Sequence, residues 1–141
     1  MPLRCVDAST VVAWLVPSQR TASLKDVWQA YAQGDDEFIA PPLLPAETLS
    51  AIRRLASRGM LSHEEAAGLV TDFLSLSIPT PVPAGLYQRA YTLATQYHRS
   101  TVYDTCYLAL AELLSCELLT LDQRLYNAVK DDFPAVRLVD G

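Results

Sequence analysis

The chain has 141 residues, of which half are hydrophobic and 19% are charged, a composition typical of globular rather than disordered proteins. Its formal net charge of −5 argues against a broad basic surface for nucleic acid, although acids gathered in one metal site would leave the remaining surface nearer neutral. It contains neither an apolar run of 18 residues nor an N-terminal basic segment followed by a long apolar run, so we expect no membrane span and no secretory leader.

Strands alternate with helices along the chain, and the length is that of one domain covering residues 1–141. Short apolar runs predict strands at 3–7, 37–41, 117–121 and 136–139, with a further short strand at 74–79. Apolar residues at helical spacing predict helices near 10–16, 21–33, 45–58, 63–74, 84–98, 102–115 and 123–129. This alternation predicts an α/β fold with a mostly parallel central sheet covered on both faces.

Local signals set several of the expected boundaries. Ser9 or Thr10 is expected to cap the first helix, and Ser62 and Glu65 have the spacing of a capping box. The proline-rich segment 78–85 cannot be helical and is too short for a domain linker, so we expect it to join two halves of one domain. Three cysteines in apolar patterns, without metal-ligand spacing, are expected to be reduced core residues of a cytoplasmic protein: Cys5, Cys106 and Cys116.

Four acids occupy similar places in these predicted elements. Asp7 closes the first strand, and Asp122 follows a late strand and opens the next helix. Glu47 and Asp104 each lie in the first turn of a helix. In a parallel sheet, the carboxyl ends of the strands and the starts of the following helices share one edge, where ligands bind. We therefore expect the four carboxylates to lie at the same edge.

Three of these acids also have purely structural explanations. Glu47 could complement a helix dipole, Asp104 has a capping-box-like spacing from Thr101, and Asp122 could be an N-cap. Asp7 is needed by none of the expected caps, which makes it the hardest to explain without a site. Each explanation stays open for a single acid, whereas the shared placement of all four favours a site.

Carboxylate oxygens with open positions suit Mg²⁺ or Mn²⁺ better than zinc, which prefers histidine and cysteine. Such a metal can activate water and hold a phosphate oxygen. The chain has no glycine-rich phosphate loop, so nucleoside triphosphate chemistry is unsupported. The four acids therefore predict the hydrolysis of a phosphodiester bond.

Three motifs carry a resemblance to a known family: VDASTVVAWL (6–15), PAETLSAIRRL (45–55) and YDTCYLALAELLSCELLTLDQRL (103–125). With them the chain resembles the PIN domain family, and within it the small VapC-like toxins of toxin–antitoxin modules. The resemblance implies a three-layer α/β/α sandwich and a ribonuclease that depends on Mg²⁺ or Mn²⁺. It implies catalytic and metal-binding roles for Asp7, Glu47, Asp104 and Asp122, with supporting hydroxyls from Ser9 and Thr120.

The resemblance also implies partners: a structured RNA cut in a single-stranded loop, a small cognate antitoxin and a second copy of the chain, with no role for a membrane. Arg54 and Arg58 follow Glu47 by seven and eleven residues, so they share roughly its helix face. They could contact RNA phosphates or the antitoxin, or simply be solvated. We expect Tyr103 and Tyr107 to pack or line a groove rather than to stack on bases.

Other functions remain to be distinguished from this one. A PIN-like module that binds RNA or a partner without cutting would share these motifs, and so would a DNA-directed nuclease of the same fold. A phosphotransfer domain fits less well. The dehalogenase type needs a second aspartate where this chain has Ser9, and the receiver type needs a lysine at a late strand end, which Lys130 does not occupy.

Overall fold

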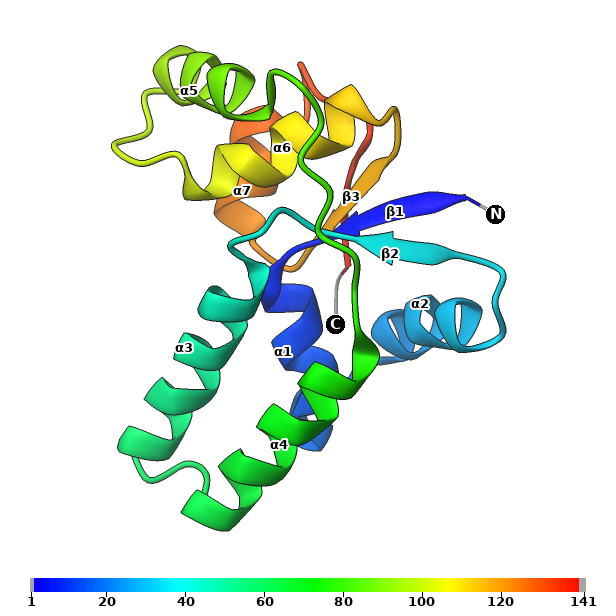
Figure 1. Ribbon diagram of the computed structural model, residues 1–141, viewed down its shortest axis with the longest axis vertical. Helices are drawn as coiled ribbons and strands as arrows, with labels where there is room; N and C mark the ends of the chain where they lie inside the picture. Colours follow the sequence, from blue (N-terminus) through cyan, green and yellow to red (C-terminus); the bar gives the residue numbers. More distant parts are fainter. Residues whose placement is uncertain (1, 140–141) are drawn as a thin grey trace.

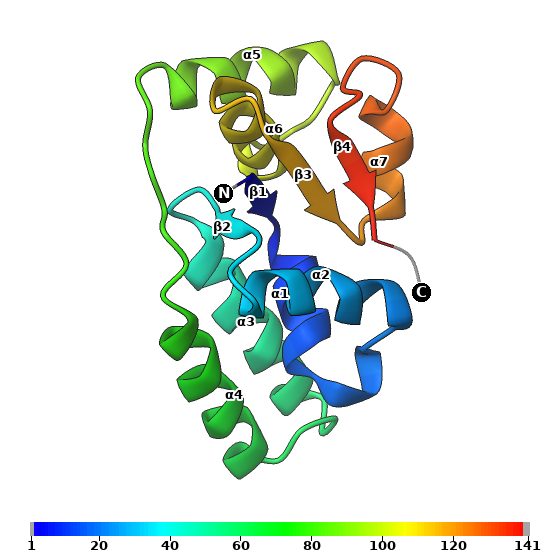
Figure 2. The same ribbon diagram turned by 90° about the vertical axis from the view of Figure 1, so that its right-hand side faces the viewer.

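The computed structural model describes residues 2–139 and contains a four-stranded sheet between two layers of helices (Figures 1 and 2). All strand pairs in the described residues are parallel, in the order β2–β1–β3–β4. The strands are β1 (Leu3–Val6), β2 (Glu37–Ile39), β3 (Glu117–Thr120) and β4 (Val136–Leu138). The predicted three-layer α/β/α sandwich with a mostly parallel sheet is confirmed.

The helices divide between the two faces of the sheet. One layer holds α1 and α2, and the other holds α6 and α7, with α5 packed outside α6 (Figure 2). A hairpin of α3 and α4 lies beside α1 and projects away from the sheet (Figure 1). The helices are α1 (Ala8–Leu15), a short 3-10 helix η1 (Pro17–Gln19), α2 (Ala22–Ala32), α3 (Leu44–Ser57), α4 (His63–Leu76), α5 (Leu86–Gln96), α6 (Tyr103–Leu113) and α7 (Gln123–Val129).

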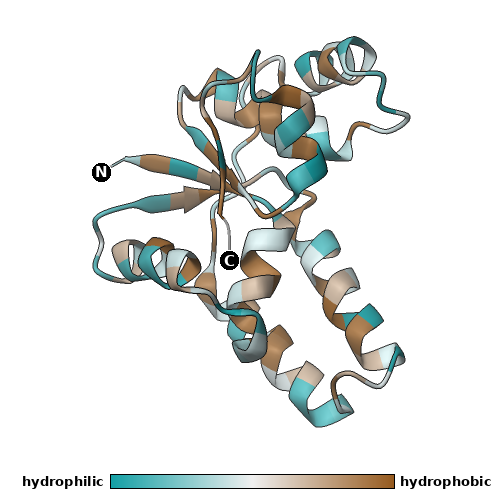
Figure 3. Ribbon diagram, turned by 180° about the vertical axis from the view of Figure 1, so that it is seen from behind, coloured by the Kyte–Doolittle hydropathy of each residue, from teal (hydrophilic) through white to brown (hydrophobic). Residues whose placement is uncertain are grey.

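The core lies between the two central strands and the helices that cover them. Helix α6 is buried from Thr105 to Ala111 because it packs on β1 and β3 while α5 covers its outer side. Hydrophobic residues, brown in Figure 3, occur in the strands, in α6 and in the other helices that cover the sheet. Cys5 and Cys106 are buried in this core, and Cys116 is half-buried; all three are free. None of the helices within residues 2–139 has the length and hydrophobicity needed to cross a bilayer.

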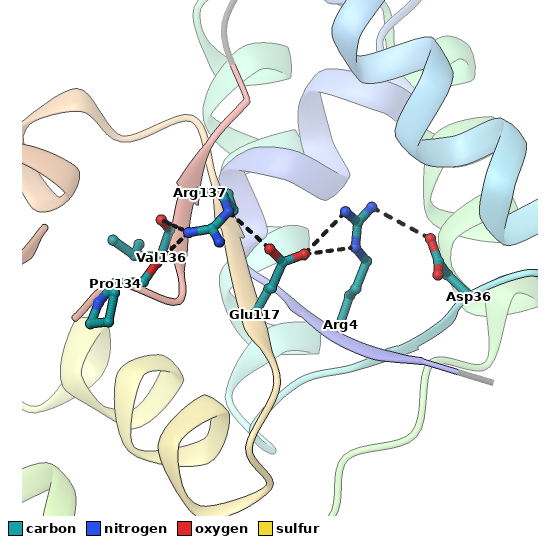
Figure 4. A network of polar contacts seen from close by, with 6 residues as sticks. All are labelled: Arg4, Asp36, Glu117, Pro134, Val136 and Arg137. Carbon is teal, nitrogen blue, oxygen red and sulfur yellow. Dashed lines mark hydrogen bonds and ion pairs between the residues drawn. The ribbon is translucent and has the colours of Figure 1, made fainter.

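A network of charged side chains ties the strands together at the amino edge of the sheet (Figure 4). Glu117 at the start of β3 accepts hydrogen bonds from Arg4 of β1, at 3.1 and 3.3 Å, and pairs with Arg137 of β4 at 2.9 Å. Arg4 also reaches Asp36, just before β2, at 3.4 Å. One chain of ion pairs therefore connects β1, β3 and β4 with the residue that precedes β2.

Two local expectations were wrong. Residues 74–79 do not form a strand: α4 continues to Leu76, and Ser77 ends it in a left-handed conformation with φ 51°. The prolines that follow lack N–H donors, so segment 78–85 crosses from α4 to α5 as an extended connection (Figure 1). The first helix begins at Ala8 instead of residue 10, because its cap is neither Ser9 nor Thr10. The capping box of Ser62 and Glu65 is confirmed.

Candidate active site

All four carboxylates line one cavity of about 540 Å³ at the carboxyl edge of the sheet. Asp7 directly follows β1, and Asp122 follows β3 after one intervening residue. Glu47 and Asp104 lie in the first turns of α3 and α6. The parallel sheet brings together acids separated by up to 115 positions in the chain, because its strand ends and helix starts share this edge.

Asp7 is almost fully buried, with 8% of its surface exposed, and both of its oxygens accept hydrogen bonds. Its Oδ1 accepts from the Thr10 amide at 3.0 Å, the Thr10 hydroxyl at 3.0 Å and the Ser9 hydroxyl at 2.7 Å. Its Oδ2 accepts from the Thr120 hydroxyl at 2.5 Å. Asp7 is thus itself the N-cap of α1, in place of Ser9 or Thr10, which the sequence predicts. Burial raises the pKa of Asp7, and these hydrogen bonds oppose the rise.

Two hydroxyls link Asp7 to the segment that carries Asp122. The Ser9 hydroxyl accepts from the amide of Leu121 at 3.1 Å, and the Thr120 hydroxyl accepts from the amide of Asp122 at 3.0 Å. Each hydroxyl therefore donates to Asp7 and accepts from the loop after β3, which sets the two acidic segments relative to each other. The contribution of Thr10 was missed, although its place three residues after Asp7 is the usual one for a capped amide.

Glu47 is held by a tyrosine from another helix. The Tyr107 hydroxyl donates to Glu47 Oε1 at 2.7 Å, and the Tyr107 side chain is buried. Burial raises the pKa of Glu47; the Tyr107 hydrogen bond opposes this rise, and the charges of Asp104 and Asp7 add to it. Tyr107 lines the cavity, as expected for a groove residue, but the sequence did not reveal its bond to Glu47. Its place three residues after Asp104 on one helix face was the available signal.

We predict that Tyr107→Phe raises the pKa of Glu47, because the phenol stabilises the ionised carboxylate more than the protonated one. An NMR titration of ¹³C-labelled glutamate side chains in the metal-free protein measures this directly. Tyr97→Phe is the matched control: it removes a tyrosine–carboxylate contact to Asp132, 3.3 Å long, outside the cavity lining. A Glu47 pKa equal in wild type and Tyr107→Phe would contradict the prediction.

Asp104 and Asp122 differ in their local roles. Helix α6 has Val102 as its N-cap without a side-chain cap, so the capping-box explanation of Asp104 with Thr101 is wrong. Burial raises the pKa of Asp104, the charge of Asp122 adds to the rise, and Arg99 opposes it. Asp122 does cap α7, because its Oδ1 accepts from the Leu125 amide at 3.1 Å. Its structural explanation is therefore correct, and it faces the same cavity as well.

Two arginines from different segments of the chain act on the acids. Arg54 of α3 lines the cavity and lowers the pKa of Glu47. Arg99, in the segment before α6, lowers the pKa of Asp104 and had not been singled out, since no motif marks it. Arg58 ends α3 and is absent from the described residues that line the cavity. Of the two arginines considered from the sequence, the structure brings Arg54 to the acids and leaves Arg58 further along the helix.

The chemistry of the cavity fits a hard divalent cation. Its lining supplies carboxylate and hydroxyl oxygens, and within residues 2–139 no thiol or imidazole contributes to it. Burial, and to a smaller extent the neighbouring carboxylates, raise the pKa values of Glu47 and Asp104. A bound cation would offset both effects by stabilising the ionised carboxylates. The acids are nevertheless spread around the cavity: no three His, Cys, Asp or Glu side chains of the described chain form a compact ligand cluster.

A larger cavity, of about 750 Å³, lies at the opposite edge of the sheet. Its charged walls include Arg4, Glu117 and Arg137, which already pair with one another. Paired charges leave little capacity for a polar ligand or a metal, so the carboxylate cavity is the candidate active site.

Comparisons with known proteins identify similar proteins along nearly the whole chain. A model of the PIN domain family matches residues 4–131, a segment that contains all four acids. Ribonuclease VapC3 of Pyrobaculum aerophilum is 33% identical over 135 residues, covering 93% of this chain and 95% of that protein. Ribonuclease VapC9 of Mycobacterium tuberculosis is 30% identical over 129 residues, covering 92% and 93%. Ribonuclease VapC12 of the same organism is 38% identical over 86 residues, covering 61% and 64%.

Proposed function

Because this chain belongs to the PIN domain family and is similar along most of its length to VapC ribonucleases, we propose that it is an endoribonuclease, the toxin of a VapBC-type toxin–antitoxin module. The observation that carries the proposal is the cavity lined by Asp7, Glu47, Asp104 and Asp122 at the carboxyl edge of the sheet. The reaction is the hydrolysis of an RNA phosphodiester bond, and it depends on Mg²⁺ or Mn²⁺.

The four acids would hold the cation. Once bound, it would activate water and stabilise the charge on the phosphate. The chain's own residues prepare this site: Ser9, Thr10 and Thr120 fix the orientation of the Asp7 carboxylate through hydrogen bonds. Tyr107 occupies one oxygen of Glu47, which limits rotation of that carboxylate. Groups held in place before the substrate arrives lose less entropy on binding and reaction.

The charge of the site explains why it needs positively charged side chains nearby. A cluster of carboxylates repels the RNA backbone, which carries one negative charge per nucleotide. Arg54, which lines the cavity beside Glu47, offsets part of that repulsion, and we assign it to a phosphate that flanks the cut bond. The charge of Arg99 acts on Asp104 in the same sense. Arg58, further along α3, remains a candidate for contact with RNA or the antitoxin.

The test is an RNA cleavage assay with purified protein free of antitoxin. RNA hairpins with randomised loops are incubated with Mg²⁺, with Mn²⁺ or with chelator. We expect cuts in the single-stranded loops in the presence of either metal and intact RNA in chelator. Intact RNA under all conditions would contradict the proposal, and tight binding without cleavage would favour a non-cutting PIN module. Faster cleavage of matching DNA hairpins would identify a DNA-directed nuclease instead.

The proposal includes a protein inhibitor, because an active ribonuclease would damage the cell that makes it. We predict that production of wild type alone arrests growth and that co-production of a small protein encoded next to it restores growth. Such an inhibitor would lay an amphipathic segment on an apolar groove and direct an arginine at the acids. Production of Asp7→Asn is the control and should be harmless. Normal growth with active wild type and no inhibitor would contradict the toxin assignment.

Three further features belong to the same proposal: a single domain over residues 1–141, a homodimer and a cytoplasmic location. Size-exclusion chromatography with light scattering tests the dimer, which should have twice the mass of the chain.

A further inference from the structure

We propose that a second cavity, next to the carboxylates, binds the nucleobase beside the phosphate that is cut. This inference rests on the proposed ribonuclease function and adds a base-binding subsite to it. The cavity has a volume of about 350 Å³ and is lined by Leu43, Ala46, Glu47, Ser50, Arg54 and Tyr103. We refer to it as the Tyr103 cavity.

The Tyr103 cavity adjoins the candidate active site. Glu47 and Arg54 line both cavities, so they stand at the boundary between the two. Tyr103 is the first residue of α6 and immediately precedes Asp104, an acid of the active site. Within one nucleotide the base and the phosphate are neighbours. A base in the Tyr103 cavity would therefore place its own phosphate near Glu47 and Arg54.

The walls of this cavity suit a base. Tyr103 has 57% of its surface exposed although it is a large aromatic residue, and the described structure gives its ring no aromatic partner. Leu43 and Ala46 of the α3 segment supply apolar surface. Proteins that bind single-stranded RNA commonly stack unpaired bases on exposed aromatic side chains. The Ser50 hydroxyl can donate or accept a hydrogen bond at the edge of a base.

A nucleic acid fits the Tyr103 cavity better than a protein side chain does. The cavity combines an aromatic ring with an exposed arginine and lies beside the groups assigned to the phosphate, which matches the alternation of base and phosphate along one strand. A protein segment would gain from the aromatic ring but has no backbone charge for Arg54. The sequence predicted that Tyr103 packs or lines a groove rather than stacks on bases; we assign it a stacking role instead.

The experiment measures the binding of a randomised 12-nucleotide single-stranded RNA by fluorescence anisotropy. All proteins carry Asp7→Asn so that the RNA stays intact, and each is titrated at several salt concentrations. We expect Tyr103→Ala to weaken binding about tenfold, since that is the effect of losing one stacked base. Tyr103→Phe keeps the ring and should bind within about twofold of the parent. Tyr87→Ala is the matched control, because Tyr87 is also 57% exposed but lies on α5, outside both cavities.

Salt dependence separates stacking from charge. Tyr103→Ala should leave the slope of log K against log salt unchanged, whereas Arg54→Gln should make it shallower by about 0.7, the value for one phosphate contact on a single strand. The inference is wrong if Tyr103→Ala binds within twofold of the parent, or if it instead only loses sensitivity to the protein inhibitor. Either result would overturn the base-binding role of Tyr103, while wild type would still cut RNA. Failure of the ribonuclease proposal is a different result: RNA uncut by wild type with Mg²⁺ and with Mn²⁺.

Discussion

Asp7→Asn is expected to lower RNA cleavage at least about hundredfold while the protein stays folded. The asparagine amide carries no charge and binds a hard divalent cation poorly, so the loss comes from the chemistry of the site. Of the four cavity acids, Asp7 accepts the most hydrogen bonds in the described structure. Its two oxygens accept four, from Ser9, Thr10 and Thr120. Initial rates of hairpin cleavage at saturating Mn²⁺ measure the effect.

The structure explains why this variant should fold. Asparagine caps helices about as well as aspartate, so its oxygen can keep the bond to the Thr10 amide. Its NH₂ group would face the Thr120 hydroxyl, which has a second lone pair to accept it. Melting curves in chelator check this point. Asp72→Asn is the control, since it removes an exposed carboxylate of α4 away from the cavity. Cleavage by pure Asp7→Asn at the wild-type rate would refute the role assigned to Asp7.

Asp104→Asn is expected to stabilise the metal-free protein or leave its stability unchanged, and to remove most of the stabilisation by Mn²⁺. Burial and the nearby charge of Asp122 both raise the pKa of Asp104, so its ionised form is disfavoured in the folded state without a cation. The neutral amide relieves that cost at pH 7. Because α6 has no side-chain cap, the substitution breaks no cap bond.

The rise in Tm caused by Mn²⁺ gives a second test of Asp104→Asn. At about 100 times its dissociation constant, Mn²⁺ should stabilise wild type by about 2.7 kcal/mol, which corresponds to a rise of roughly 8 °C in Tm for a chain of this size. Asp104→Asn should show less than about a third of that rise, and Asp72→Asn all of it. Calorimetric melting of the three proteins, with chelator and with Mn²⁺, supplies the comparison. Equal shifts in wild type and Asp104→Asn would exclude Asp104 as a ligand.

Local signals misled the sequence analysis where two structures compete for the same residues. The segment 74–79 has strand-like alternation, but its first residues complete α4, and the prolines after Ser77 cannot donate to a sheet. Ser9 and Thr10 are good capping residues by type, yet Asp7 precedes them and takes the cap. Each error concerns a boundary, where residues close together in the sequence compete for the same structural role.

The sequence by itself determined the α/β class and the edge at which the acids gather. Hydrophobic periodicity distinguishes strands from helices, and parallel pairing then brings every strand end to one side, so residues such as Asp7 and Asp122 could be placed without coordinates. Only the tertiary structure decided which side chains meet there. The Tyr107–Glu47 bond spans 60 positions, and the Thr120–Asp7 bond spans 113. Such contacts depend on the packing of α6 and β3 against other elements, and no periodicity within a short segment carries that information.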